Sequence, residues 1–268
     1  MRVHTNTLRE RVRREDLLVF GGIVDSRSGA AVEMYHDVGY DVLLIDREHT
    51  ALNSETILEH IRMARALGLP VMVRVAEEDY HELNRTLDQG PDGVFVPRIR
   101  SRAQVEEVVR TVSYPPRGVR GVAGSTCPAG RYMGWPSLPE QLAAITEAVV
   151  IGIQIETREA LEQLEDVVSV PGVDIAVIGC DDLTVALGAP GDVRSDAFVA
   201  AGEAVIATCR RHGVLPGIAI GDPRLAADWV ARGMRVLWYA TDVTLMWSAA
   251  AQQLQRLHEA MGTQGGAA

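Results

Sequence analysis

Eight short apolar segments, separated by helical patterns, constrain this chain more than any other feature of its sequence. Several are apolar throughout, which is typical of strands buried on both faces. The strand segments are residues 17–24, 42–46, 71–75, 93–97, 149–156, 175–179, 215–220 and 236–240. Helices are expected at residues 26–38, 53–67, 80–88, 101–112, 158–168, 197–212, 223–232 and 242–261.

Eight strand–helix units in 268 residues are what a (β/α)8 barrel, or TIM barrel, requires. A doubly wound open sheet is the alternative, and it is weakened because no GxGxxG motif follows the first strand segment. The composition does not break between units. We therefore expect one domain over residues 1–268, with a short N-terminal arm at 1–15 and a frayed tail at 262–268.

One stretch interrupts the alternation. Residues 114–137 read YPPRGVRGVAGSTCPAGRYMGWPS and are rich in glycine and proline. Loops of this length inside a compact domain are uncommon and are usually functional. We therefore expect this loop to contribute to a binding site.

The charge and cysteine content exclude several classes of protein. The net charge of −10 disfavours nucleic acids and anionic membranes as partners. The first residues lack the apolar core of a secretory signal, and no apolar run approaches the length that spans a bilayer. Three widely spaced cysteines form no CxxC pair, so a reducing cytoplasm is the expected location.

Polar residues cluster where the strand segments end. If the fold is a barrel, all of them project to the same mouth, where ligands bind in such folds. They are Asp46, Glu48 and His49 in VLLIDREH, Arg74 in VMVRV, Gln154 and Glu156 in VVIGIQIE, and Asp181 and Asp182 after the segment 175–179. A charged, solvated loop explains the cluster after residue 45 equally well.

Two of these carboxylates, Glu156 and Asp182, follow neighbouring strand segments and can face one point. Together with water and a substrate oxygen they suit Mg²⁺ or Mn²⁺, whereas cysteine and histidine are too sparse for zinc. Other readings remain open: Glu156 as an acid in the first turn of a helix, Asp182 as an N-cap, and His49 as a loop residue. Arg74 must be paired or face a cavity, because an unpaired buried charge is costly.

Several segments together resemble the HpcH/HpaI aldolase family, the metal-dependent class II pyruvate aldolases. They cover about residues 17 to 250 in the family's order, and the family fold is a (β/α)8 barrel. The segments are LLIDREHT, PVMVRV, DGVFVPRI, YPPRGVRGV, IQIETREALE, VDIAVIGCDDLT and PGIAI.

The resemblance implies a role for each matching residue. Glu156 and Asp182 correspond to the ligands of a divalent metal, Mg²⁺ or Mn²⁺ and conceivably Co²⁺. Arg74 corresponds to the arginine that binds the keto oxygen and stabilises an enolate. The acid–base group corresponds to His49 with Asp46, and with Asp88, which in the family pairs with the histidine across a subunit boundary. Substrate-binding positions correspond to Gln154, to Cys180 and Asp181, and to Arg131.

The implied reaction is reversible cleavage of a 4-hydroxy-2-oxo acid into pyruvate, or a similar 2-oxo acid, and an aldehyde. Alternatives are a lyase acting on a CoA thioester, as in the citrate lyase β-like branch, a biosynthetic aldolase with an unusual acceptor, and a non-catalytic barrel subunit. The chain departs from the family pattern at Arg47, which could reach an acidic substrate or pair with Glu48, at Cys180-Asp181, and in the loop 123–136.

The resemblance also implies a homo-oligomer, a hexamer in which the last helices are exchanged between subunits. The apolar residues Leu245, Met246, Trp247 and Leu254 of the final helix are compatible with that exchange. Ordinary packing against the barrel accounts for them as well, and it is the expectation for any apolar stripe on a helix.

Overall fold

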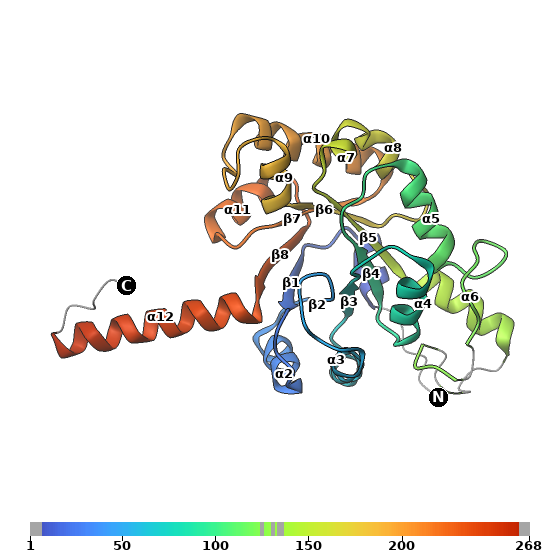
Figure 1. The fold of residues 1–268 in the computed structure, drawn as a ribbon, viewed down its shortest axis with the longest axis horizontal. Coiled ribbons are helices and arrows are strands. Elements are labelled where there is room, and N and C mark those ends of the chain that lie inside the picture. The colour runs from blue at the N-terminus through green and yellow to red at the C-terminus, as the bar shows by residue number, and fades with distance from the viewer. Residues whose placement is uncertain (1–6, 124–125, 130–131, 133–136, 263–268) are drawn as a thin grey trace.

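Eight parallel strands close into a barrel in chain order (Figure 1). The computed structural model describes residues 7–123, 126–129, 132 and 137–262. The strands are β1 (Leu18–Ile23), β2 (Val42–Asp46), β3 (Val71–Arg74), β4 (Gly93–Val96), β5 (Val150–Ile155), β6 (Ile175–Gly179), β7 (Leu215–Ala219) and β8 (Val236–Thr241). The predicted (β/α)8 barrel is confirmed, and the open-sheet alternative is wrong because β1 pairs with β8.

Helices surround the strands. They are α1 (Thr7–Arg13), α2 (Gly29–Val38), α3 (Ser54–Leu67), α4 (Tyr80–Asp88), α5 (Arg102–Val112), α6 (Leu138–Ala148), α7 (Arg158–Glu162), α8 (Leu164–Val168), α9 (Cys180–Ala186), α10 (Asp196–His212), α11 (Pro223–Arg232) and α12 (Asp242–Met261). Local signals set their ends: the Asn53 side chain accepts from the Thr56 amide before α3, and Gly68 ends that helix in the left-handed region.

The structure differs from the prediction at three helices. The helix expected over 158–168 is two short ones, α7 and α8, divided at Gln163. Helix α6 directly follows the glycine- and proline-rich stretch and was not predicted. Helix α9 was not predicted. Its N-cap is Gly179, so the interpretation of Asp182 as an N-cap is wrong; Asp181 and Asp182 lie in the first turn, where they complement the helix dipole.

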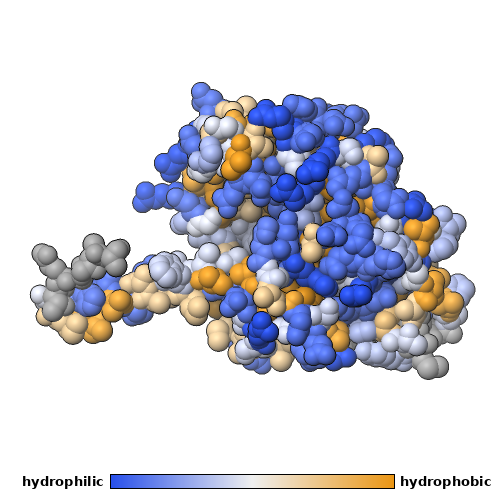
Figure 2. Space-filling model, viewed as in Figure 1, coloured by the Kyte–Doolittle hydropathy of each residue, from blue (hydrophilic) through white to orange (hydrophobic). Residues whose placement is uncertain are grey.

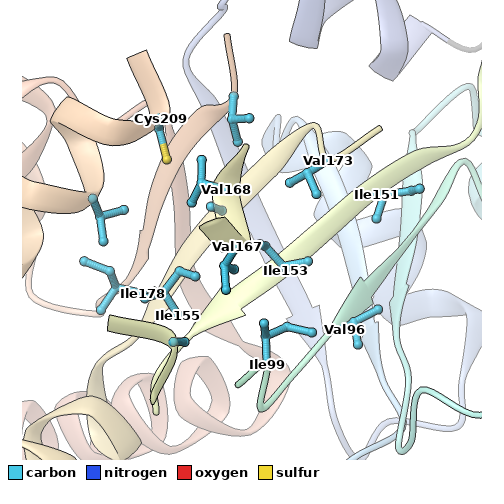
Figure 3. Close-up of a cluster of buried hydrophobic side chains, with 14 of the residues drawn as sticks. Val96, Ile99, Ile151, Ile153, Ile155, Val167, Val168, Val173, Ile178 and Cys209 are labelled. Carbon is cyan, nitrogen blue, oxygen red and sulfur yellow. The ribbon is translucent and has the colours of Figure 1, made fainter. Parts of the chain in front are cut away.

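The N-terminal end of the barrel is covered by α1. Its residues Leu8 and Val12 are buried in the same cluster as the inward-facing strand residues Phe20 and Met72. Outside the strands, a larger cluster joins β4, β5 and β6 to the helices that cover them, and Figure 3 shows Ile153 and Val167 within it. The closed barrel bottom leaves the carboxyl ends of the strands as the open face.

Helix α12 leaves the barrel after β8 and projects away from it (Figure 1). None of its residues is buried against the described part of the chain, and Met246 and Trp247 are 69% and 77% exposed. Figure 2 shows apolar residues along this projecting arm. The expected packing of the final helix against the barrel is therefore wrong for this chain alone. No helix in the described ranges is long and apolar enough to cross a bilayer.

Candidate active site at the carboxyl ends of the strands

A cavity of about 680 Å³ opens at the carboxyl ends of the strands. Seven predicted residues line it together, six of them predicted from strand ends and Cys180 from the family resemblance. They are His49, Arg74, Gln154, Glu156, Cys180, Asp181 and Asp182. The barrel thus brings into one space side chains that follow β2, β3, β5 and β6.

Arg74 is held by two carboxylates from β2 and the residues after it. Asp46 lies beside Arg74 in the ladder of β2 and β3, and its two oxygens accept from Nε at 2.8 Å and from Nη2 at 2.6 Å. Nη1 lies 3.1 Å from Glu48 Oε2 and 3.4 Å from Gln154 Oε1. Such bidentate, charge-assisted pairing compensates the buried guanidinium and fixes its plane.

Trp238 of β8 packs on the same guanidinium. The Arg74 Cζ lies 4.6 Å from the centroid of the Trp238 ring, which is a cation–π arrangement. Gly22 of β1 makes this possible, because a Cβ there would lie 2.8 Å from Trp238 Nε1. Trp238 was not predicted as a site residue: within VLWYA it reads as another apolar strand position.

Glu156 lies at the centre of a second group. Its Oε1 accepts from the backbone N–H of Arg98 at 2.7 Å, and its Oε2 accepts from Gln154 Nε2 at 2.7 Å. Burial, with the charges of Asp182 and Glu48, raises the pKa of Glu156 to about 7. Glu156 follows β5 and precedes the N-cap of α7, so the reading of it as a first-turn acid is wrong.

Arg98 contacts both predicted metal ligands, Glu156 and Asp182, and was not predicted as a site residue. Its backbone has φ of 54°, a left-handed conformation that is uncommon outside glycine and found often at functional sites. Its side chain Nη1 lies 3.5 Å from Asp182 Oδ1, while its N–H holds Glu156.

The carboxylates of Glu156 and Asp182 fit a divalent cation, and Glu48 lies close to them. Burial raises the pKa of Glu48, and the charges of Asp46 and Asp182 add to that effect. Gly179 leaves open the space beside Glu156, since a Cβ there would collide with its Oε2. Among the described residues no three histidine, cysteine, aspartate or glutamate side chains converge as a complete metal cage. Two carboxylates with remaining positions for water and substrate are, however, what Mg²⁺ typically uses.

Asp88 lies apart from this cavity, whereas His49 is an exposed member of its lining. Asp88, at the end of α4, pairs with the buried Arg120 at 3.0 Å, and no hydrogen bond or ion pair within the described ranges joins it to His49. The His49 side chain is 65% exposed and lies 3.6 Å from Glu48 Oε2. Arg131 falls outside the described residues.

Arg47 does not pair with Glu48, as one reading of the sequence allowed. Its Nε lies 3.0 Å from Glu82 Oε1 on α4, while Glu48 contacts Arg74 instead. The Cys180 thiol is buried, and burial raises its pKa to about 12, so Cys180 stays a neutral wall of the cavity.

Known proteins are similar to this chain in sequence. A family model described as HpcH/HpaI aldolase/citrate lyase matches residues 23–249. A 4-hydroxy-2-oxo-heptane-1,7-dioate aldolase of Shigella sonnei is 33% identical over 223 residues, which are 83% of this chain and 84% of that protein.

Solved structures show the same likeness. An HpcH/HpaI aldolase from Desulfitobacterium hafniense superposes with a TM-score of 0.89 at 27% identity, covering 94% of this chain and 96% of its own. A citrate synthase superposes with a TM-score of 0.84 at 25% identity, covering 95% and 98%. The chain therefore belongs to the HpcH/HpaI aldolase/citrate lyase family.

Proposed function

We propose that this protein is a divalent-metal-dependent carbon–carbon lyase that cleaves a 4-hydroxy-2-oxo acid into a pyruvate-like 2-oxo acid and an aldehyde. One observation carries the proposal: Arg74, fixed by Asp46, faces the same cavity as the carboxylates of Glu156 and Asp182. A fixed cation beside a metal-binding pair suits a substrate in which a carboxylate and a keto oxygen are adjacent.

The cation is held by Glu156 and Asp182 in this proposal, and Mg²⁺ or Mn²⁺ matches their oxygen donors. When bound, it supplies a Lewis acid that polarises the 2-oxo group. Gln154 orients Glu156 through its 2.7 Å hydrogen bond, and the Arg98 amide orients the other oxygen. The backbone near Cys180 to Asp182, at the start of α9, borders the space for the substrate carboxylate.

Arg74 binds the oxygen on which negative charge develops. Its Nε and Nη2 are committed to Asp46, whereas Nη1 makes the longest contacts, at 3.1 and 3.4 Å. Nη1 is therefore the donor that can turn to the keto oxygen, and it stabilises the enolate more than the ground state.

His49 moves the proton in this proposal. It lies at the exposed rim of the cavity, where the C4 hydroxyl of a substrate bound to Arg74 would extend. As general base it takes the hydroxyl proton while the C3–C4 bond breaks, and the enolate is then protonated at C3. In this proposal Asp88, which pairs with Arg120 within its own chain, orients the His49 of a neighbouring subunit.

We also propose a homo-oligomer in which α12 is covered by another copy of the chain. Exposed apolar residues concentrate on that helix: Val243, Leu245, Met246, Trp247, Leu254, Leu257 and Met261. Apolar area of this extent is unusual on a monomer and marks an interaction surface.

The same site supports carbon–carbon bond formation, because an enolate held by Arg74 can add to a carbonyl acceptor. The superposition with a citrate synthase favours this second direction. The structure contains nothing that favours a CoA thioester over a free 2-oxo acid within the described residues.

Pyruvate release tests the proposal. Purified protein is incubated with a panel of 4-hydroxy-2-oxo acids and with oxaloacetate, first in EDTA and then with Mg²⁺, Mn²⁺ or Co²⁺ restored. We expect release that disappears in EDTA and returns with metal. Absence of release from every substrate with metal present would refute the proposal.

A further inference from the structure

Part of the wall of the cavity is built by the first three turns of α12 and by Thr241, the residue before them. Thr241, Thr244, Leu245, Ser248 and Gln252 line the cavity there. Residues 244, 248 and 252 are spaced by four, so they form a single stripe on the helix. The stripe carries two hydroxyl groups and an amide, and no charge.

This stripe, bordered by Leu245, lies on a different side of α12 from most of its exposed apolar residues. At about 100° per residue, Met246, Trp247 and Leu254 point to the other side of the helix from Ser248 and Gln252. A partner on the apolar side would therefore leave the stripe facing the cavity. The two sides of α12 are suited to different tasks, one to a protein partner and one to a small molecule.

Two members of the stripe have unused hydrogen-bonding groups. The Thr244 hydroxyl is occupied, since it donates to the Thr241 carbonyl at 3.0 Å within the N-terminal cap of α12. The side chains of Ser248 and Gln252 make no hydrogen bond to another described residue. They are thus available to a ligand that extends outward from Arg74.

The charge of the cavity argues against an anionic group at this end. Among the described lining residues, Arg74 is the one permanent cation, and it is already paired with Asp46 and Glu48. Glu156, Asp181 and Asp182 also face the cavity. A bound divalent cation and the nearby Arg98 offset these charges but leave little attraction for a second carboxylate on the substrate.

We propose, resting on the lyase function above, that the aldehyde partner is a neutral, hydroxylated aldehyde whose hydroxyl groups bind Ser248 and Gln252. An aldehyde that ends in a carboxylate fits this wall less well. Different groups then recognise each end of the substrate. Arg74 and the cation held by Glu156 and Asp182 bind the 2-oxo acid, and neutral hydrogen-bonding groups bind the aldehyde.

Aldol addition of pyruvate to three four-carbon aldehydes tests this inference in the Mg²⁺-loaded protein. Erythrose is hydroxylated, butanal is apolar and succinic semialdehyde is acidic. We expect kcat/KM to be highest for erythrose and lowest for succinic semialdehyde. Gln252→Ala should lower the ratio of kcat/KM for erythrose to kcat/KM for butanal about fivefold, which is the effect of losing one neutral hydrogen bond. Gln252→Lys should raise the rate with succinic semialdehyde.

Gln253→Ala is the matched control, because it removes the same side chain from the neighbouring position, which faces away from the stripe. It should leave the ratio unchanged. Oxaloacetate decarboxylation is measured alongside, since it uses the same enolate without any aldehyde. If oxaloacetate is decarboxylated but succinic semialdehyde is preferred, or Gln252→Ala acts no differently from Gln253→Ala, this inference is overturned and the lyase function stands. If neither reaction occurs with metal present, both fall.

Discussion

Arg74 and Asp46 lie side by side in the β2–β3 ladder, and the guanidinium meets both carboxylate oxygens, at 2.8 Å from Nε and 2.6 Å from Nη2. Both residues are almost fully buried, so the pair has little contact with bulk water. This pair sets the direction of Nη1, the donor left for substrate. Removing Asp46 would leave a buried cation uncompensated on that side, which is strongly unfavourable.

The first prediction concerns the geometry of the Arg74 guanidinium. Arg74→Lys keeps the charge but cannot form the two-point contact with Asp46, and we expect kcat for pyruvate release to fall roughly 100- to 1,000-fold. Arg74→Ala should remove most of the turnover. Metal affinity, measured by titration calorimetry, should be retained in both variants, because Arg74 is not a ligand. Full activity in Arg74→Ala would show that the site is assigned to the wrong residue.

The second prediction concerns the aromatic support of Arg74. Trp238→Leu removes the cation–π contact, and we expect kcat/KM to fall about fivefold to twentyfold. Gly22→Ala should act in the same direction by pushing the indole away, since its Cβ would lie 2.8 Å from Trp238 Nε1. Steady-state kinetics with tryptophan fluorescence measures both effects.

Gly29→Ala is the control for that substitution, because its Cβ would meet only the flexible end of Met63 and lies away from the cavity. Kinetics of Gly22→Ala equal to those of Gly29→Ala would contradict the proposed role of Trp238.

The third prediction concerns pH. Because the pKa of Glu156 is raised to about 7 in the metal-free protein, the carboxyl is protonated below that pH and must lose the proton to bind a cation. Apparent Mg²⁺ affinity should therefore rise about tenfold per pH unit up to pH 7 and level off above it. Calorimetry in two buffers of different ionisation enthalpy counts the proton released.

The same shift has a consequence for folding. A carboxyl with a raised folded-state pKa contributes most stability at low pH, and that contribution is lost as pH rises toward 7. Glu156→Gln should therefore weaken metal binding. Its free energy of unfolding without metal, measured relative to that of the parent, should be higher at pH 8 than at pH 5. Metal affinity of Glu156→Gln equal to that of the parent would remove Glu156 from the metal site.

The strands and the polar residues at their ends could be predicted because both depend on local sequence. A short, β-branched apolar run between turn signals favours a buried strand, and closure of the barrel then brings Arg74 and Glu156 to the same end. Trp238 could not be predicted in the same way. Its place over Arg74 depends on the pairing of β8 with β1, where the register shifts between Phe20 and Gly21.

The remaining differences have similar causes. Arg98 acts through its backbone conformation, which no residue pattern in VPRI indicates. The bounds of α12 could be predicted from its periodicity, but an apolar stripe does not say what covers it. Local patterns thus predicted the strands and most of the helices, whereas the place of Trp238 depends on a contact between distant elements and that of Arg98 on its backbone conformation.

The last prediction concerns α12. If its apolar side is covered by another copy of the chain, a charge placed there should dissociate the oligomer. Trp247→Glu is the strongest test, since Trp247 is 77% exposed in the single chain and its loss costs no packing within it. Light scattering after gel filtration should show a smaller particle, with helix content and thermal stability of the barrel largely kept. Gln252→Glu adds the same charge on the cavity side of the helix and should leave the particle unchanged. Equal mass for both variants and the parent would mean that this side of α12 does not hold the oligomer together.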